Sequence, residues 1–359
     1  MTSYYNVSRR EFLKLGGLGF GMAAFRPWQF RRPFLEFPAH ERLGRVTSDF
    51  GQTVNLRAQP SSEAAEVGTL PADAVVPWLR EVVGYTPYRN QRWVETPEGY
   101  IWSPLLQPVR NLPNVPGDTF PIVIDNPGMW VEVTVPYVDA TLSGAAPISP
   151  RVSYLIENRL PVRFYYSQVM WADAIRTTEN GVEYHVREPH GSYGDQFWSP
   201  AEGWRPILPE DVTPISPEVE DKSILIDLNR QTLSCFEEGR EVYFSRISSG
   251  RFEAETPTGE NLRIFWKLIS VHMSGGSASG AGYDLAGIGW PTFIAAGGIA
   301  IHGTFWHNNF GERTSAGCVN VRTEDAKFVS RWTAPAVPYE TGVVDVSGTS
   351  LGTTVRVIE

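Results

Sequence analysis

Residues 302–321 read HGTFWHNNFGERTSAGCVNV and contain the features that decide the fold of the C-terminal part of the chain. The apolar run Ile299-Ala300-Ile301 leads into His302, and a tight turn with Gly317 leads into Cys318. An apolar run followed by a Gly- and Asn-rich loop is typical of a buried strand that ends in a loop. We therefore expect a strand that presents His302 and a turn that presents Cys318.

His302 and Cys318 together have the side chains that cysteine catalysis requires. A free thiol has a pKa of about 8.5 and is mostly protonated at neutral pH, so a cysteine nucleophile needs a base or a cation nearby. The imidazole of His302 is the short-range candidate for that base. Spacing alone leaves a second interpretation open, because two residue types in a loop region coincide easily.

Cys235 and Cys318 are the two cysteines of the chain. In an exported protein they could form a disulfide. Cys235, however, alternates with Leu233 on one face of an expected strand, as a small buried hydrophobic residue does. Cys318 follows a glycine in a turn, where a reactive thiol is accessible. We therefore expect two free thiols with different roles.

Upstream of this stretch, short apolar alternations joined by turns predict a β-meander. They are residues 224–228, 232–236 and 242–247. Downstream, residues 323–329 have a helical pattern, with Thr323 placed to cap the helix. Strands are thus expected to dominate this region.

The loop and the turn also resemble the signature of the L,D-transpeptidase (YkuD-type) family, in which a His-Gly pair is followed by Ser-His-Gly-Cys-x-Asn or Arg. The matching residues are His302, Gly303, Ser315, Gly317, Cys318 and Asn320. The resemblance covers residues 221–359, through Thr256-Pro257-Thr258-Gly259 and an ending in Gly352 to Val357. It implies a catalytic domain at residues 216–359, a β-sandwich or barrel with one short helix.

The resemblance implies a thioester mechanism. Cys318 would attack the L-centre to D-centre peptide bond of a peptidoglycan tetrapeptide stem and release the terminal D-alanine. His302, oriented by the carbonyl of Gly303, would take the thiol proton and later activate the acceptor amine. The N–H groups of Gly317 and Cys318 would hold the oxyanion. A diamino acid side chain of a neighbouring stem would be the acceptor and give a 3-3 cross-link, without a metal or a cofactor.

One position departs from the family pattern, because the residue two before the nucleophile is Ala316 where the family usually has His. We expect Ser315 and Asn320 to shape the site or to contact the stem peptide. His307 is a candidate to supply the missing imidazole from the intervening loop. The alternative for His307 is a loop histidine packed on Trp306.

Residues 274–283 are rich in Gly and Ser and lie where the family has a lid over the cleft. Tyr283 and Trp290 are candidates for contacting the substrate, although aromatic residues flanked by Gly and Pro are as often loop anchors. For His272, which follows an expected strand, a core or surface histidine is favoured over a catalytic role.

The N-terminus, residues 1–43, resembles a twin-arginine export signal followed by a linker. Ser8-Arg9-Arg10-Glu11-Phe12-Leu13-Lys14 precedes a short Gly-rich apolar stretch that ends at Phe25. A basic amphipathic N-terminus is the alternative. The apolar stretch is too short to cross a bilayer as a mature helix. We therefore expect an exported cell-wall protein that is either soluble outside the membrane or held to it only by an uncleaved signal.

Residues 44–110 have short alternations and turns typical of a small barrel. They resemble a bacterial Src-homology-3-like domain, through Asn55-Leu56-Arg57-Ala58-Gln59-Pro60 and Gly99 to Trp102. Residues 111–215 form a β-rich middle module, for which a degenerate second barrel is one interpretation, because residues 196–204 repeat the end of the first. His185 and His190 of this module are expected to be ordinary histidines, since no metal-ligand spacing surrounds them.

Composition limits the remaining choices. The Gly, Pro and aromatic content favours a mainly β chain, and the net charge of -9 would repel a phosphate backbone, which excludes nucleic acid as a partner. Three functions stay open: the transpeptidase, an L,D-carboxypeptidase or endopeptidase that uses water at the same site, and a wall-binding protein with a decayed site.

Overall fold

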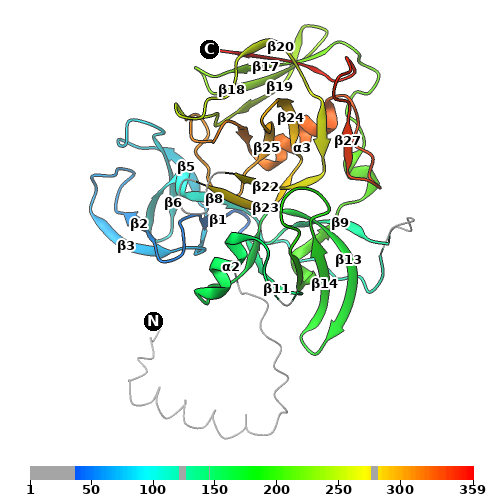
Figure 1. Cartoon of the computed structure of the whole chain (residues 1–359). Helices are drawn as coiled ribbons and strands as arrows, with labels where there is room; N and C mark the ends of the chain where they lie inside the picture. The colour runs from blue at the N-terminus through cyan, green and yellow to red at the C-terminus, as the bar shows by residue number, and fades with distance from the viewer. Residues whose placement is uncertain (1–36, 121–126, 145, 276–281) are drawn as a thin grey trace, which may run out of the picture. The chain divides into compact units, whose positions relative to one another are not determined.

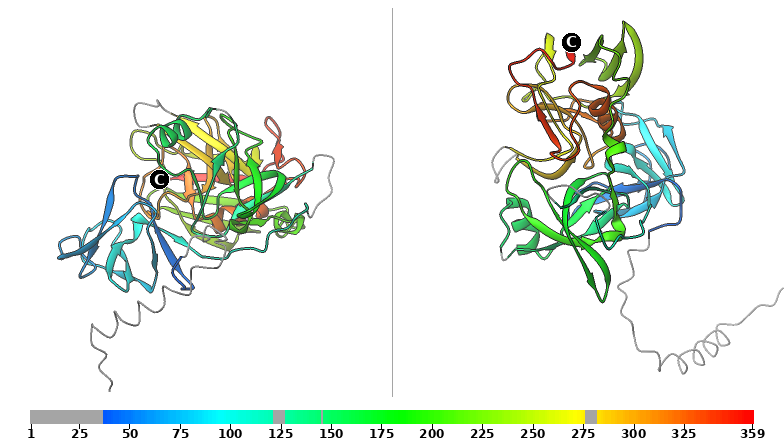
Figure 2. Two further views of the ribbon diagram at one scale, coloured as in Figure 1. Left: turned by 90° about the horizontal axis from the view of Figure 1, so that it is seen from below. Right: turned by 90° about the vertical axis from the view of Figure 1, so that its right-hand side faces the viewer.

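The computed structural model of the chain describes residues 37–120, 127–144, 146–275 and 282–359 (Figure 1, Figure 2). Strands make up most of the regular structure of these residues, which confirms the mainly β fold. The expected export signal and most of the expected lid segment lie outside the described residues. The signal and the lid therefore stay predictions.

Residues 43–109 form two antiparallel sheets, of orders β4-β1-β8 and β3-β2-β7-β6-β5. The elements are β1 (Leu43–Val46), β2 (Thr53–Arg57), β3 (Glu66–Pro71), β4 (Val75–Pro77), β5 (Arg80–Val83), β6 (Arg92–Thr96), β7 (Gly99–Trp102), the 3-10 turn η1 (Ser103–Leu105) and β8 (Leu106–Val109). Alternate side chains of the strands meet in one core around Trp78 and Ile101. The alternating strands are present as expected, whereas the kinship to Src-homology-3-like domains stays a prediction.

Residues 129–206 form a six-stranded sheet of order β11-β15-β14-β13-β9-β16 and a two-stranded sheet of β10 and β12. The elements are β9 (Met129–Val133), β10 (Tyr137–Asp139), β11 (Thr141–Leu142), α2 (Pro150–Glu157), β12 (Arg163–Tyr165), β13 (Val169–Thr178), β14 (Gly181–Arg187), β15 (Gln196–Pro200), η2 (Ala201–Gly203) and β16 (Trp204–Pro206), and η3 (Pro209–Val212) follows. The strand patterns do not predict α2. Its start nevertheless has a signal, because the Ser149 side chain accepts a hydrogen bond from the N–H of Val152 and Pro150 begins the helix.

The two modules end alike. Trp102-Ser103-Pro104 and Trp198-Ser199-Pro200 each lead from a strand through a 3-10 turn into the last strand of the module. Ser103 and Ser199 are both fully buried. The repeated sequence therefore adopts a repeated local structure, which supports the similarity seen in the sequence.

The C-terminal residues form two five-stranded sheets that share one core. The first has the order β19-β18-β17-β28-β20, with β17 (Lys222–Asp227), β18 (Thr232–Glu237), β19 (Arg240–Arg246), β20 (Gly259–Arg263) and β28 (Thr354–Ile358). The predicted meander is confirmed as β17 to β19, and β28 pairs with β17 in parallel. Ile226 of this sheet and Ile301 of the other belong to the same buried cluster. Two sheets that bury their facing sides form a sandwich.

The second sheet has the order β26-β25-β24-β21-β27, and a separate hairpin pairs β22 with β23. The strands are β21 (Trp266–Leu268), β22 (Ser270–Gly275), β23 (Tyr283–Gly289), β24 (Thr292–Ala295), β25 (Ile299–Gly303), β26 (Val319–Val321) and β27 (Val343–Asp345). Figures 1 and 2 show α3 (Thr323–Trp332) beside β24 and β25. The helix thus covers the strand that carries His302.

The predicted cap of α3 is wrong. Thr323 lies inside the first turn, and the N-cap residue Arg322 makes no side-chain cap bond. The Thr323 hydroxyl instead forms a 2.9 Å hydrogen bond with the hydroxyl of Ser167. The hydroxyl of Thr323, which the local sequence predicts as the N-cap group, is therefore bonded to a residue distant in sequence.

Candidate active site

The parallel pairing of β25 with β26 brings the predicted site residues together. In the register Ile301 faces Val319 and His302 faces Asn320, so Cys318 lies immediately before the paired strand. His302 and Asn320 are 3% and 2% exposed. Residues far apart along the loop thus become neighbours because two buried strands lie side by side.

A hydrogen-bonded turn holds Cys318 in place. The hydroxyl of Ser315 donates to the carbonyl of Cys318 at 2.5 Å and accepts the N–H of Gly317 at 3.1 Å. Gly317 has a φ of +118°, and a Cβ there would come within 2.8 Å of Ile299. Only glycine fits both requirements.

The predicted oxyanion donor Gly317 is therefore not free in this structure, because its N–H already donates to Ser315. The N–H of Cys318 has no hydrogen-bond acceptor in the described part of the chain. Cys318 is thus the backbone donor that the geometry leaves available beside the sulfur. Ser315 shapes the turn, which is one of the two roles expected for it.

Two residues outside the loop, Thr256 and Ser248, support this turn. The Thr256 hydroxyl donates to the Gly317 carbonyl at 2.8 Å and accepts the N–H of Gly250 at 2.9 Å. Ser248 exchanges two backbone hydrogen bonds with Asn320. The role of Thr256 was missed, although its place in the Thr-Pro-Thr-Gly segment was a usable signal.

Hydrogen bonds determine the tautomer of His302. Nδ1 lies 2.9 Å from the carbonyl of Gly303, which can only accept, so Nδ1 carries the proton. Nε2 therefore accepts the hydrogen bond of 3.1 Å from the side-chain amide of Asn320. Burial lowers the pKa of His302 to about 4, and His307 adds to this decrease. His302 is a neutral imidazole with its lone pair on Nε2, as a general base requires.

His307 lies behind Asn320. Nδ1 of His307 accepts the N–H of Asn309 at 3.1 Å, so Nε2 carries the proton and donates to Oδ1 of Asn320 at 3.2 Å. Burial lowers the pKa of His307 to about 4. The donor and acceptor directions then agree along the series of hydrogen bonds from His307 through Asn320 to His302. The ring also lies at an edge-on angle to Trp306, as the alternative interpretation had it.

The sulfur of Cys318 lies against the start of β25. It donates to the carbonyl of Gly298 at 3.5 Å and receives a hydrogen bond from the N–H of Ala300. Burial raises the pKa of the thiol, and the Ala300 bond opposes this. In the described residues no hydrogen bond joins the sulfur to His302, so the geometry shows no thiolate–imidazolium ion pair.

The second cysteine has a different environment. Cys235 is fully buried in β18, and both cysteines are free, which confirms the expectation of two unpaired thiols. Burial raises the pKa of Cys235, and the charge of Asp325 adds to the increase. A protonated thiol without solvent access is a packing residue.

The two aromatic candidates have different fates. Tyr283 is 40% exposed on β23; burial raises the pKa of its hydroxyl, and so does the nearby Cys318. Trp290 is 2% exposed and belongs to the core, with the ammonium of Lys327 over its ring. The structure therefore contradicts a substrate contact by Trp290, because the ring has no surface to offer, and it agrees with a loop anchor.

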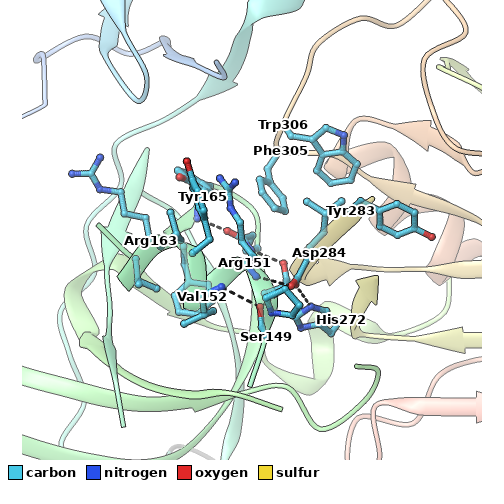
Figure 3. A pocket seen from close by; sticks show the side chains of 18 of the residues that line it. Ser149, Arg151, Val152, Arg163, Tyr165, His272, Tyr283, Asp284, Phe305 and Trp306 are labelled. Carbon is cyan, nitrogen blue, oxygen red and sulfur yellow. Dashed lines mark hydrogen bonds and ion pairs between the residues drawn. The ribbon is translucent and has the colours of Figure 1, made fainter. Parts of the chain in front are cut away.

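A cavity of about 640 Å³ adjoins this site (Figure 3). Tyr283 and Trp306 line it, and Trp306 also lies 5.9 Å from the ring of His302. Cys318 and His302 are not among the lining residues. The cavity is thus next to the reactive groups and does not contain them.

His272 lies between two carboxylates at the wall of this cavity. Nδ1 is 2.5 Å from Glu188 and Nε2 is 2.6 Å from Asp284. Burial by itself would lower the pKa of His272, but the hydrogen bonds to Asp284 and Glu188 outweigh it and raise the pKa to about 9. His272 is therefore a structural cation, in keeping with the core role favoured by the sequence.

The two histidines of the middle module, His185 and His190, have ordinary hydrogen-bond partners. His185 bonds to Asp173 at 2.6 Å and His190 bonds to the carbonyl of Thr341 at 3.1 Å. In the described ranges no group of His, Cys, Asp and Glu could hold a metal ion. No helix of these ranges is long and apolar enough to cross a membrane.

Comparison with known proteins identifies the C-terminal region. The family model of the L,D-transpeptidase catalytic domain (YkuD) matches residues 221–357. No curated protein matches the sequence. Solved structures that resemble the chain include a cysteine mutant of Enterococcus faecium L,D-transpeptidase, with 23% identity over 43% of this chain and a TM-score of 0.30.

Two mycobacterial structures are also similar. The L,D-transpeptidase from Mycobacterium smegmatis has 16% identity over 62% of this chain, 99% of its own length and a TM-score of 0.32. L,D-transpeptidase 3 from Mycobacterium tuberculosis has 18% identity over 68% of this chain, 100% of its own length and a TM-score of 0.31. The chain spans only 56% of the length of the Enterococcus faecium structure.

Proposed function

We propose that this protein is an exported peptidoglycan L,D-transpeptidase that forms 3-3 cross-links. The premise is that residues 221–357 match the L,D-transpeptidase catalytic domain. The observation that carries the proposal is the position of a neutral His302 with its lone pair on Nε2. Its strand β25 pairs with β26, which begins directly after Cys318. Export rests on the resemblance of residues 1–25 to a twin-arginine signal.

In the first step the sulfur of Cys318 attacks the carbonyl of the L-centre to D-centre bond of the donor stem. The S–C bond forms, the C–N bond to the terminal D-alanine breaks, and the thiol proton passes through His302 to the leaving amine. The N–H of Cys318 faces the oxyanion, and Gly317 can join it only after its bond to Ser315 opens.

In the second step the acceptor amine attacks the thioester carbonyl. The new C–N bond forms, the C–S bond breaks, and a proton of the amine passes through His302 to the sulfur. Nε2 has one lone pair, which Asn320 occupies in this structure. Proton transfer therefore requires Nε2 to exchange the Asn320 amide for the thiol or the amine.

Asn320 and His307 are positioning residues in this proposal. His307 fixes the amide of Asn320, and Asn320 in turn holds the ring of His302. His307 would thus replace the family imidazole missing at Ala316 in an indirect way, through Asn320. Ala316 itself is exposed.

Incubation of the purified protein with a tetrapeptide stem, followed by intact-mass analysis, tests the proposal. A thioester adduct on Cys318 with loss of D-alanine is expected, then a cross-linked dimer when an acceptor stem is added. Cys318→Ala should form no adduct, and Cys235→Ala is the matched control that should form it. Tripeptide without dimer would show a carboxypeptidase, and unchanged substrate would point to a decayed site.

A carbapenem tests the reactivity of the thiol independently, because enzymes of the family that this domain resembles accept carbapenems as pseudo-substrates. One adduct per chain, located at Cys318, is the expected result. The Cys318→Ala variant should show no adduct, and Cys235→Ala should retain it. An unreacted wild-type protein after long incubation with several carbapenems would contradict the proposed acyl-enzyme.

A further inference from the structure

The cavity beside the catalytic residues has the size of a ligand site. Its volume of about 640 Å³ is within the usual range of pockets that hold small molecules. Its walls come from different parts of the chain, among them α2, β12, the β22–β23 hairpin and the loop that contains Trp306. Figure 3 shows Arg151, Tyr165, Tyr283 and Trp306 around it.

Two lining residues connect the cavity to the reaction. Tyr283 is close enough to Cys318 to interact electrostatically with the sulfur. Trp306 lies 5.9 Å from the ring of His302, at a tilt of 35°. The end of the cavity at these two aromatic side chains is therefore the part of it nearest to Cys318 and His302.

Most charges that line the cavity are neutralised within the protein. Arg45 and Arg163 form ion pairs with opposite oxygens of Asp73 at 2.7 and 2.9 Å. The cation of His272 is held by Asp284 and by a second carboxylate behind it. Arg163 also pairs with Asp139 at 2.9 Å, so each of these cations has a carboxylate of its own and none is left unpaired for a ligand.

Arg151 is the exception among the cations of the lining, and Asp49 is a lining carboxylate that likewise forms no ion pair in the described ranges. Its guanidinium lines the cavity and acts electrostatically on Tyr165, yet no carboxylate of the described ranges lies within ion-pair distance of it. Its backbone is fixed, because the N–H of Arg151 and the hydroxyl of Ser149 both donate to Asp284 of the hairpin, at 3.0 and 2.7 Å. The backbone that carries the cation is therefore anchored beside the strand that carries Tyr283.

We propose that this cavity binds the acceptor stem peptide and that Arg151 holds a carboxylate of that peptide. The inference rests on the proposed transferase function, which needs a second stem at the thioester while the donor is still bound to Cys318. Arg binds carboxylates through two parallel hydrogen bonds, and this geometry orients as well as attracts. The acceptor amine then arrives from the side on which Trp306 lies against His302.

Equilibrium binding of a tripeptide stem to the non-reacting Cys318→Ala protein tests the cavity apart from the chemistry. Adding Arg151→Gln should weaken binding by about 10- to 100-fold, the loss expected for a charge-assisted hydrogen bond. Arg240→Gln, an exposed arginine of β19 outside the cavity, is the matched control and should not change binding. A tripeptide with amidated carboxyl groups should bind weakly to the Cys318→Ala protein. Its affinity should not change when Arg151→Gln is added to that protein.

Equal binding by the Cys318→Ala protein with and without Arg151→Gln would overturn the inference. In the Cys318-containing enzyme, Arg151→Gln should leave thioester formation from a tetrapeptide stem unchanged and should reduce the yield of dimer relative to hydrolysed tripeptide. Slower thioester formation by Arg151→Gln would place the donor in the cavity and contradict the proposal. Absence of any thioester in the unaltered protein would contradict the proposed function, while the binding measurement would still decide on the cavity.

Discussion

His302 and His272 are both buried, at 3% and 5% exposure, yet the structure gives them different charge states. His302 has a carbonyl and an amide as partners, and its pKa is lowered to about 4. His272 has two carboxylates, and its pKa is raised to about 9. Burial disfavours the cation at both sites, so the partners decide whether a ring is a base or a structural cation.

The largest effect is expected for His302→Ala, which should slow thioester formation from a tetrapeptide stem by about 100- to 10,000-fold because the proton acceptor is lost. Intact-mass time courses measure the rate. The comparison variant is His272→Gln, which should retain most of the rate. A rate for His302→Ala close to that of the unaltered protein would remove His302 from the role of base.

His272→Gln should instead lower the free energy of unfolding, by about 3 kcal/mol, because Glu188 and Asp284 lose the cation between them. The direction in which this stabilisation changes with pH follows from the raised pKa of His272. The contribution of His272 is fully present below pH 6.5 and is lost as pH rises through about 9. Denaturant unfolding at about pH 6 and pH 9.5, on either side of this transition, measures it, and an equal loss at both values would contradict the charged state.

His307→Ala should slow thioester formation by about 10-fold, because Asn320 loses the donor that orients its amide. His307→Gln keeps a donor and should restore part of the rate, which a purely structural role would not predict. Addition of Ala316→His to His307→Ala should not restore it, since the missing hydrogen bond is to Asn320. Full rescue by Ala316→His would show that the ring acts directly at the sulfur.

Cys235→Ala should lower the free energy of unfolding by about 1 kcal/mol, because a small cavity opens in the core beside Leu233. The rate of thioester formation should not change. Chemical denaturation and the mass time course together measure the two quantities. A folded Cys235→Ala protein without thioester chemistry would reverse the roles of the two thiols.

The smallest expected effect is the pH dependence of thioester formation between about pH 5.5 and 8, on either side of the ordinary histidine pKa. The pKa of His302 is lowered to about 4, so the base is already neutral across this range. No fall in rate is expected near about pH 6.5, where an ordinary histidine titrates. A clear decrease with its midpoint there would mean that His302 has carboxylate or solvent contacts in the working enzyme.

Much of the fold could be predicted from local patterns. Alternation over residues 224–247 predicts the meander, because one face of each strand is buried. The helix α2 could not be predicted in the same way, since its eight residues are too few for a reliable helical period. The predicted N-cap of α3 was wrong because the Thr323 hydroxyl is hydrogen-bonded to Ser167, which is distant in sequence.

The candidate site divides in the same way. The spacing of His302 and Cys318 left a cysteine site as one of two interpretations, because two residue types coincide easily in a loop. The resemblance of Gly303, Ser315 and Asn320 to the family signature turned that interpretation into a prediction. The directions of the hydrogen bonds were not predictable, since they depend on which strand faces which. Trp290 shows the limit, because its neighbours suggest a loop anchor or a substrate contact and only its burial decides.

Local sequence patterns were enough to predict a mainly β chain with a thiol and an imidazole on neighbouring segments, because strand alternation, turn glycines and side-chain chemistry are local properties. The charge of each histidine, and the lack of a carboxylate partner for Arg151 in the described ranges, came from the packing of distant segments. The physical reason is that charge and pairing depend on groups brought together across long separations in the chain, which no local pattern contains.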